Sequence, residues 1–333
     1  MVSLGGVRDA LAKIEMNGRE LCILSPILES SAINRTLSEQ VGRTIRIVFK
    51  AEHLQPVGSF KIRGAMNFAL SIDPSRRARG LVTHSSGNHG AAVAQVAEFL
   101  NVPCVVVVPR DTPDEKVGRI RSYGAEVIPC EPSIESRTTI CSSIVLERGM
   151  TEIPPFDHEW TIHGQGTLAM EIMAQVPNLD TIVVAVGGCG MIAGVITAAK
   201  GLHPTIRVYG AEPSAVDDTH ASLKAGQRRG PTDPSAVSIC DALRVSPPGK
   251  LGWEVVRSGC DGVILVPDSE TIGAMKVLMN DLKQVVEPSG AVATAAVLSD
   301  DFIEILKMNP DMQQIVVVLC GGNIGIDAIR SYI

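Results

Sequence analysis

GSFKIRG (residues 58–64) and SSGNHG (residues 85–90) are the two stretches that decide the fold of this chain. The first places one lysine, Lys61, between a serine and the start of a helix-like run. Most lysines lie solvated on the protein surface. Lys61, however, is flanked by Phe60 and Ile62, and a lysine held in an enclosed site has a lowered pKa and forms imines with carbonyl compounds. The sequence therefore predicts a reactive amine at residue 61.

Strand-like and helix-like runs alternate outward from these two stretches. The strand-like runs are rich in β-branched residues and bounded by Gly, Pro or Asn. They are residues 45–50, 80–84, 104–108, 126–130, 181–186, 207–211, 262–266 and 314–319. The helix-like runs are residues 64–71, 90–100, 114–123, 133–148, 168–175, 191–200 and 269–282. This alternation predicts an α/β protein with right-handed βαβ units and a largely parallel sheet.

Three glycine-containing turns each follow an apolar strand. They are residues 85–90, 187–191 and 320–323. In open α/β folds, ligands bind at the carboxyl edge of the strands, where such turns lie. The first precedes a helix and suits a carboxylate, and the second suits a single phosphate because its backbone can form an anion-binding nest. Each turn alone is weak evidence, because glycine turns close most βα units.

Composition and charge exclude several classes of protein. The 333 residues carry a net charge of −6 without a basic block, so nucleic acid is not an expected partner. The 8 cysteines form no CxxC pair, and no secretory signal is visible, which indicates a cytoplasmic protein with reduced thiols. Residues 181–199 carry no charge. Their glycine cluster favours a strand, a turn and a helix over a membrane span.

Six motifs occur together and in one order: GSFKIRGA, SSGNHG, GQGT (164–167), AEPS (211–214), EPSG (287–290) and CGGN (320–323). In this the chain resembles the fold-type II pyridoxal-phosphate enzymes, the serine/threonine dehydratase and serine racemase family, over nearly its whole length. The resemblance implies a tryptophan synthase β-like fold of two α/β lobes with mostly parallel twisted sheets and the cofactor in the cleft. It places a large lobe at residues 1–71 and 157–333 and a small mobile lobe at 72–156, and it implies a homodimer.

The resemblance also implies roles for individual residues. Lys61 would hold pyridoxal 5′-phosphate as a Schiff base and act as the base on one face of the substrate Cα. The other cofactor-binding residues would be Phe60, Asn88, Gly187, Gly188, Cys189, Gly190, Met191 and Cys320. The substrate carboxylate would be bound by Ser85, Ser86, Asn88, His89 and Arg137. Glu212, Asp218 and the carbonyl of Val216 would bind Mg²⁺ or Ca²⁺, although a solvated acidic loop is an alternative for this segment.

Within the family, the resemblance is strongest to the serine racemases, which interconvert L-serine and D-serine and eliminate serine to pyruvate and ammonia. Ser86 carries this expectation: racemisation needs a second acid or base on the opposite face, and the family's dehydratases often have alanine there. A helix cap or a carboxylate contact is the other interpretation of Ser86. The alternatives are a dehydratase of L-serine, L-threonine or 3-hydroxyaspartate, and a non-catalytic homologue that binds a ligand.

Four positions depart from the family pattern. Cys189 replaces one of the usual glycines of the phosphate turn, where a Cβ is strained if φ is positive and otherwise crowds the phosphate. Cys320 and Phe156 are more typical of dehydratases than of racemases. Gln55-Pro56-Val57 lacks the Lys-Thr pair associated with nucleotide binding. ATP activation is therefore not expected, although three residues match other parts of that site: Tyr123, Lys283 and Asn323.

Overall fold

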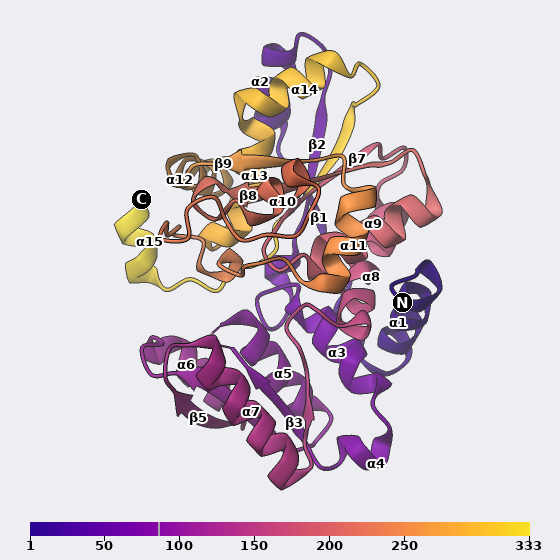
Figure 1. Cartoon of the computed structure of the whole chain (residues 1–333). Helices are drawn as coiled ribbons and strands as arrows, with labels where there is room; N and C mark the ends of the chain where they lie inside the picture. The colour runs from indigo at the N-terminus through magenta and orange to yellow at the C-terminus, as the bar shows by residue number, and fades with distance from the viewer. Residues whose placement is uncertain (86) are drawn as a thin grey trace.

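The structure, a computed structural model, describes residues 1–85 and 87–333. Their strands form two sheets (Figure 1). The larger sheet has six strands in the order β1-β2-β10-β7-β8-β9. Its strands are β1 (Ile27–Glu29), β2 (Arg46–Lys50), β10 (Gln314–Val318), β7 (Thr181–Ala185), β8 (Arg207–Pro213) and β9 (Gly262–Val266). All neighbours in this sheet are parallel except β1, which runs antiparallel to β2 at one edge.

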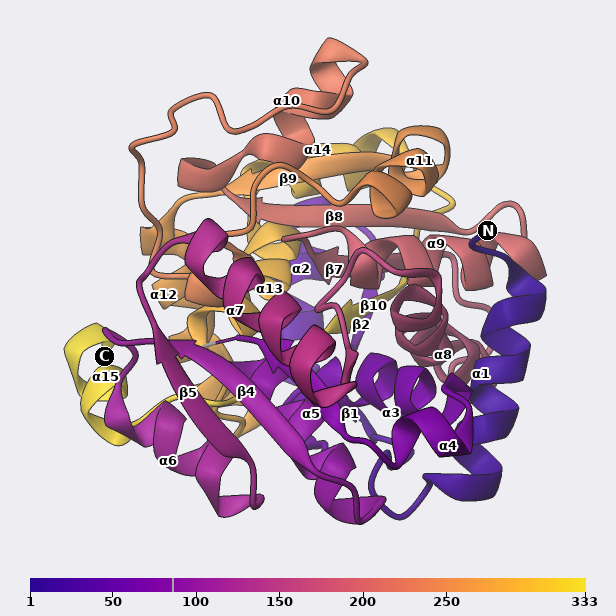
Figure 2. The ribbon, with the colours of Figure 1, turned by 60° about the horizontal axis from the view of Figure 1, so that its bottom comes forward.

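The smaller sheet is built from a segment that lies, in the sequence, between the two parts of the chain that build the larger sheet. Its four strands are parallel in the order β5-β4-β3-β6. They are β5 (Glu126–Cys130), β4 (Cys104–Pro109), β3 (Leu81–His84) and β6 (Thr151–Glu152). Figure 2 shows this sheet with α5, α6 and α7 beside it, apart from the larger sheet. The expected lobe boundaries at residues 72 and 156 stay a prediction.

Helices surround both sheets. In chain order they are α1 (Leu4–Asn17), α2 (Ser31–Val41), α3 (Lys61–Ser71), α4 (Pro74–Arg77), α5 (Asn88–Phe99), α6 (Asp114–Ser122), α7 (Ile134–Arg148), α8 (Glu159–Gln175), α9 (Gly190–Leu202), α10 (Asp218–Ala225), α11 (Lys250–Gly259), α12 (Asp268–Val277), α13 (Pro288–Leu298), α14 (Asp300–Met308) and α15 (Ile326–Tyr332). The short 3₁₀ turns η1 (Glu52–Leu54), η2 (Ser214–Val216) and η3 (Asp241–Leu243) join some of them.

The apolar runs form the buried centre of the larger sheet. Every residue of β7 is buried, and so are Ile315 to Val318 of β10. Valine and isoleucine dominate both strands, because a parallel strand covered on both faces by helices needs apolar side chains on both sides. The carboxyl ends of these strands lead into the glycine turns at 187 and 321, so the core fixes where the turns lie.

Glycines allow α3, α8 and α9 to pack closely. A Cβ at Gly164 of α8 would lie 2.5 Å from the carbonyl oxygen of Arg63, and one at Gly194 of α9 would lie 2.5 Å from the backbone nitrogen of Gly166. These contacts hold the helix that begins at Lys61 against α8. The motif GQGT is therefore a helix–helix contact inside α8, which starts at Glu159, nine residues earlier than residue 168, where the sequence pattern predicts it.

The uncharged segment 181–199 is the strand β7, a glycine turn and part of α9. This confirms the interpretation drawn from its glycine cluster. Within residues 1–85 and 87–333, no helix is both long and apolar enough to span a bilayer.

Candidate active site

A cavity lies where the carboxyl ends of β7 and β10 meet the start of α3. The empty space between its lining atoms is about 550 Å³, part of it open to solvent. The lining residues come from segments far apart in the chain. They are Phe60, Lys61, Asn88, Pro155, Phe156, Gln165, Ala185, Val186, Gly187, Gly188, Cys189, Gly190, Met191, Ile192, Ala242, Leu243, Glu287, Ser289 and Cys320. All nine residues expected to bind the cofactor are among them.

Lys61 is fixed in place because the segment before it is tied to the turn after β10. Ser59 and Gly321 form an isolated antiparallel bridge. The backbone N–H of Phe60 donates to the carbonyl of Cys320 over 3.0 Å, and the N–H of Gly322 donates to the carbonyl of Gly58 over 2.9 Å. Lys61 then begins α3. Two glycine-containing motifs distant in sequence thus form one rigid wall of the cavity.

The Lys61 amine is buried, and its environment keeps it reactive. Its Nζ donates a hydrogen bond to the carbonyl of Pro155 over 2.8 Å and lies 5.2 Å from the centre of the Phe60 ring. Burial lowers the pKa of Lys61 to about 8, because removal from water disfavours the ammonium form. A substantial fraction of this amine is therefore neutral at mildly alkaline pH, as imine formation requires.

The turn 187–190 offers free backbone donors at the start of α9. No side chain caps this helix, so its first N–H groups and its dipole can receive an anion. Phe156 packs directly over the turn: a Cβ at Gly188 would lie 2.5 Å from its ring, and one at Gly190 would lie 2.9 Å from its Cβ. Glycine is required at both positions because no side chain fits beneath Phe156.

Cys189 adopts the left-handed conformation, with φ of +66°. The sequence left open whether the backbone at this residue is strained by a positive φ or the thiol crowds the phosphate; the backbone is strained. The Cys189 thiol does not lie free in the turn, since its Sγ is 3.6 Å from the hydroxyl of Thr219. The Cβ of Cys189 packs against Gly252. A side chain at residue 252 would clash with it, because a Cβ added to Gly252 would lie 2.8 Å from the Cβ of Cys189. Burial raises the pKa of the Cys189 thiol well above its ordinary value.

Cys320 places a neutral thiol in the cavity wall. Its Sγ donates to the carbonyl of Ser289 over 3.3 Å. Burial, followed by the nearby Glu287, raises the pKa of Cys320 well above its ordinary value. The group next to the cavity is thus an uncharged thiol, and a thiol cannot hold a pyridine nitrogen protonated as a carboxylate does.

Among the residues expected to bind the substrate carboxylate, only Asn88 lines the cavity in the part of the chain that the structure describes. His89 is buried, its Nε2 lies 2.9 Å from the carbonyl oxygen of Ile153, and burial lowers its pKa to about 3, so its ring is neutral. Ser85 Oγ accepts from the N–H of Gly87, and Arg137 lies on α7. Ser86 is outside the described residues.

Glu212 and Asp218, two of the expected cation ligands, are each only 1% exposed. A solvated acidic loop is therefore the wrong interpretation. The Glu212 carboxylate accepts from the N–H groups of Thr219 and His220 over 3.0 and 2.9 Å. Burial raises the pKa of both carboxyls, with the charge of Asp218 adding to the effect on Glu212. Oδ2 of Asp218 is buried without a hydrogen-bond partner in the described residues, which suits a cation.

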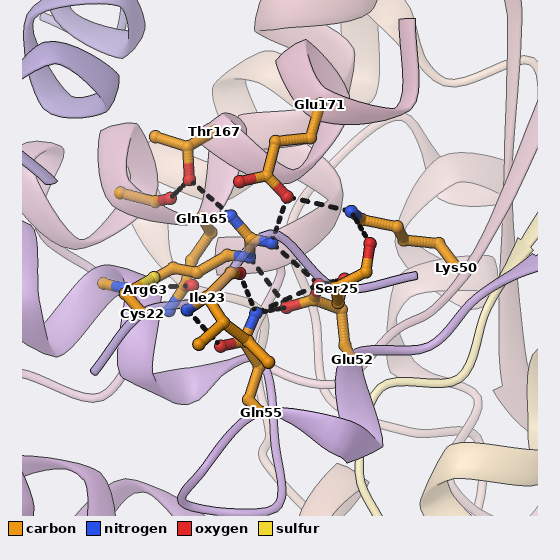
Figure 3. Close-up of polar contacts among 12 residues, drawn as sticks. Cys22, Ile23, Ser25, Lys50, Glu52, Gln55, Arg63, Gln165, Thr167 and Glu171 are labelled. Carbon is orange, nitrogen blue, oxygen red and sulfur yellow. Dashed lines mark hydrogen bonds and ion pairs between the residues drawn. The ribbon is translucent and has the colours of Figure 1, made fainter. Parts of the chain in front are cut away.

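A buried ion network (Figure 3) centres on Arg63, which lies two residues after Lys61 in α3. Arg63 donates to both oxygens of Glu52 over 2.7 and 2.8 Å and to Glu171 over 2.6 Å. Lys50 donates to Glu171 over 2.8 Å. Although burial alone would raise the pKa of Glu171, the charge and hydrogen bonds of Arg63 and then Lys50 lower it to about 2. Arg63 thus joins α3 to η1 and α8, and Lys50 joins β2 to α8.

Residues 25–321 match the family described as pyridoxal-phosphate dependent enzyme. The chain belongs to this family. A serine racemase from Oryza sativa subsp. indica is 40% identical over 323 residues, covering 97% of this chain and 91% of that protein. The structure of maize serine racemase superposes with a TM-score of 0.91 at 38% identity, covering 99% and 96% of the two chains. The threonine deaminase from T.th. gives a TM-score of 0.86 at 34% identity, covering 97% and 99%.

The cavity fits the cofactor of this family. Lys61 supplies the amine for the imine, and the uncapped start of α9 supplies donors for the phosphate. Gly188 and Gly190 have no Cβ, which leaves room for the Phe156 side chain beside the turn. The fold-type II architecture implied by the family resemblance was therefore correct, and the structural relatives share it.

Sequence reasoning missed Glu287 as a member of the cavity. The motif EPSG marked its position and gave it no role. The structure places its carboxyl against Asn88, whose Nδ2 donates to Oε1 over 2.7 Å. A glutamate before a proline at the start of an all-apolar helix was the available signal, because such a carboxyl is buried with the helix.

Proposed function

We propose that the chain is a serine racemase that interconverts L-serine and D-serine and also eliminates serine to pyruvate and ammonia. The observation that carries the proposal is Lys61, a buried amine with lowered pKa, opposite an uncapped helix start in one cavity. The cofactor, when bound, supplies the electron sink that makes the substrate Cα acidic. The relatives named serine racemase cover nearly the whole chain.

Proton transfer at both faces of Cα distinguishes racemisation from elimination alone. Lys61 is the base on one face, because its amine can exchange a proton near neutral pH. Ser86 is the residue proposed for the other face, on the strength of its place in SSGNHG. Asn88 is the carboxylate-binding residue that the cavity geometry supports, and Ser85, His89 and Arg137 keep this role as proposals from the resemblance.

A dehydratase without useful racemisation is the second candidate, and two observations favour it. Cys320 provides a neutral thiol in the cavity wall, and the structural relatives include a threonine deaminase. Its substrate would be L-serine, L-threonine or 3-hydroxyaspartate. Each of these has a β-hydroxyl that can leave once the Cα proton is removed.

Incubation with L-serine tests the function. We expect D-serine, pyruvate and ammonia to accumulate, measured by chiral chromatography and a coupled pyruvate assay. Ser86→Ala should lower racemisation by about a hundredfold or more while much of the elimination of L-serine survives, because only racemisation needs the second face. Formation of pyruvate without D-serine in the wild-type reaction would exclude the racemase and favour the dehydratase. Equal loss of both activities in Ser86→Ala would contradict the two-base assignment.

A divalent cation should stabilise the protein through Glu212, Asp218 and the carbonyl of Val216. With Mg²⁺ or Ca²⁺ at a hundred times its dissociation constant, linkage adds about 2.7 kcal/mol to the free energy of unfolding. Asp218→Asn should abolish this gain, since it removes a charged ligand with a buried free oxygen. The exposed Asp300→Asn variant is the matched control. An equal cation effect on Asp218→Asn and the control would exclude this site.

We also propose the assembly and lobe arrangement that the resemblance implies. The small lobe, residues 72–156, would close on substrate and exclude water, and two chains would form a homodimer. Two contacts support a closed arrangement of α6 against the rest of the chain: Lys116 pairs with Asp241, and Arg119 donates to Asn323. We do not expect ATP to act as an effector, because Asn323 already donates hydrogen bonds to Val57 and Asn88.

A further inference from the structure

Glu287 is an ionisable residue of the cavity to which neither the proposed reaction nor the sequence motifs give a role. It is 5% exposed and lines the same space as Lys61. Its carboxyl lies against the backbone of Gly321, where an added Cβ would come within 2.4 Å of Oε1. The carboxyl therefore lies between Asn88 and the turn that begins at Cys320.

A chain of amides fixes how Glu287 is held. Asn323 Nδ2 donates to Oδ1 of Asn88 over 2.6 Å, and Asn88 Nδ2 donates to Oε1 of Glu287 over 2.7 Å. Because Asn88 uses its oxygen toward Asn323, only its NH₂ group faces the carboxyl. Oε1 is thus the acceptor in this pair, and the proton of a neutral Glu287 carboxyl belongs on Oε2.

The charges around Glu287 do not favour its ionised form. Burial, followed by the negative charge of Asp241 on η3, raises the pKa of Glu287 to about 7, against the opposing effects of Asn88 and Lys116. Lys116 on α6 is already paired with Asp241. Cys320 is a neutral thiol, and the Lys61 amine is converted to an imine when the cofactor is bound. No cation in the described residues makes an ion pair with Glu287.

We propose that Glu287 must carry a proton for the cofactor to occupy the cavity, so that cofactor retention is linked to protonation of this one carboxyl. The cofactor brings a phosphate with a charge of about −1.5 to −2 at neutral pH. Its arrival also displaces water from around the carboxyl, and both effects act against a second negative charge in the cavity. Above pH 7 the protein must take up a proton to bind its cofactor.

The pH dependence of ligand binding to the cofactor-free protein tests this linkage. The probe is pyridoxine 5′-phosphate, which has the ring and phosphate but no aldehyde, so imine formation with Lys61 does not contribute. Its affinity for the wild-type protein should fall above pH 7, by up to about tenfold per pH unit because Glu287 takes up one proton, and by a further amount as Lys61 loses its charge near pH 8. Glu287→Gln keeps the acceptor for Asn88 and should retain only the fall due to Lys61, binding up to about a hundredfold tighter than wild type at pH 9.

Glu152→Gln is the matched control, because burial also raises the pKa of Glu152 and this residue does not line the cavity. It should keep the wild-type pH dependence. An affinity of the wild-type protein that stays level between pH 7 and 9, or the same slope in Glu287→Gln, would overturn the proposal. Because the probe needs no turnover, the result is independent of whether serine is the substrate.

The stability of the cofactor-free protein gives a second readout. A carboxyl whose pKa rises from 4.5 in the unfolded chain to about 7 in the folded protein stabilises the fold fully below pH 4.5. That contribution is lost as the pH rises to about 7, because the folded state binds more protons over this interval. Glu287→Gln should flatten this part of the stability profile, and an unchanged profile would contradict the protonation of Glu287.

Discussion

Lys61→Ala will bind the cofactor without forming the imine, so the absorption band of the imine will be absent and activity will fall by about a thousandfold or more. The amine is the nucleophile and, in the proposed reaction, the base, and no other lysine of the described chain lines the cavity. The free energy of unfolding should change by no more than about 1 kcal/mol. Removal of the buried amine loses packing contacts, but it also removes the cost of desolvating the amine, and the two effects offset each other. Absorption spectra and urea titrations measure both effects.

The control for Lys61→Ala is Lys224→Ala, on an exposed face of α10. It should keep the band and the activity. Borohydride reduction of the wild-type protein, followed by peptide mapping, should place the cofactor mass on the peptide that contains Lys61. An imine band that persists in Lys61→Ala would end the assignment of the amine, and a colourless wild-type protein would instead support a non-catalytic ligand-binding homologue.

The sequence predicted the strands of the core because burial on both faces leaves a visible apolar run. Eight of the ten strands within residues 1–85 and 87–333 lie at the expected places. β1 and β6 have only three and two residues, too few for an alternating pattern to appear. α13 was missed for a different reason: nearly every residue of PSGAVATAAVL is buried, so apolar and polar residues do not alternate with a helical period.

The sequence motifs predicted the part of the candidate site that consists of backbone turns. Backbone motifs with glycine have a defined geometry, so the turns at 187 and 320 came together with Lys61 as expected. The motifs did not predict the orientation of the side chains. His89 turns its ring to the carbonyl of Ile153, and Cys189 turns its thiol to Thr219. Both orientations depend on neighbours that are distant in sequence.

Arg63→Met is expected to lower the free energy of unfolding by about 3–5 kcal/mol, because it leaves the buried Glu52 carboxylate without its ion-pair partner. Arg63 and Glu52 are both 0% exposed, so water cannot solvate the Glu52 carboxylate when its bidentate partner is removed. Urea denaturation of the cofactor-free protein measures the loss. The matched control is Arg46→Met in the exposed pair with Glu29, where the loss should stay below about 1 kcal/mol.

The double variant Arg63→Met with Glu52→Gln separates charge from packing. Glu171 keeps Lys50 and Arg19 as partners after Arg63 is removed, whereas Glu52 loses the only ion pair it makes in the described residues. Neutralising Glu52 should therefore recover part of the stability lost in Arg63→Met, giving a coupling energy of about 1–3 kcal/mol. Additive losses would mean that the network acts by filling space. Coupled losses would show that the charge of Arg63 holds α3, and with it Lys61, against η1 and α8.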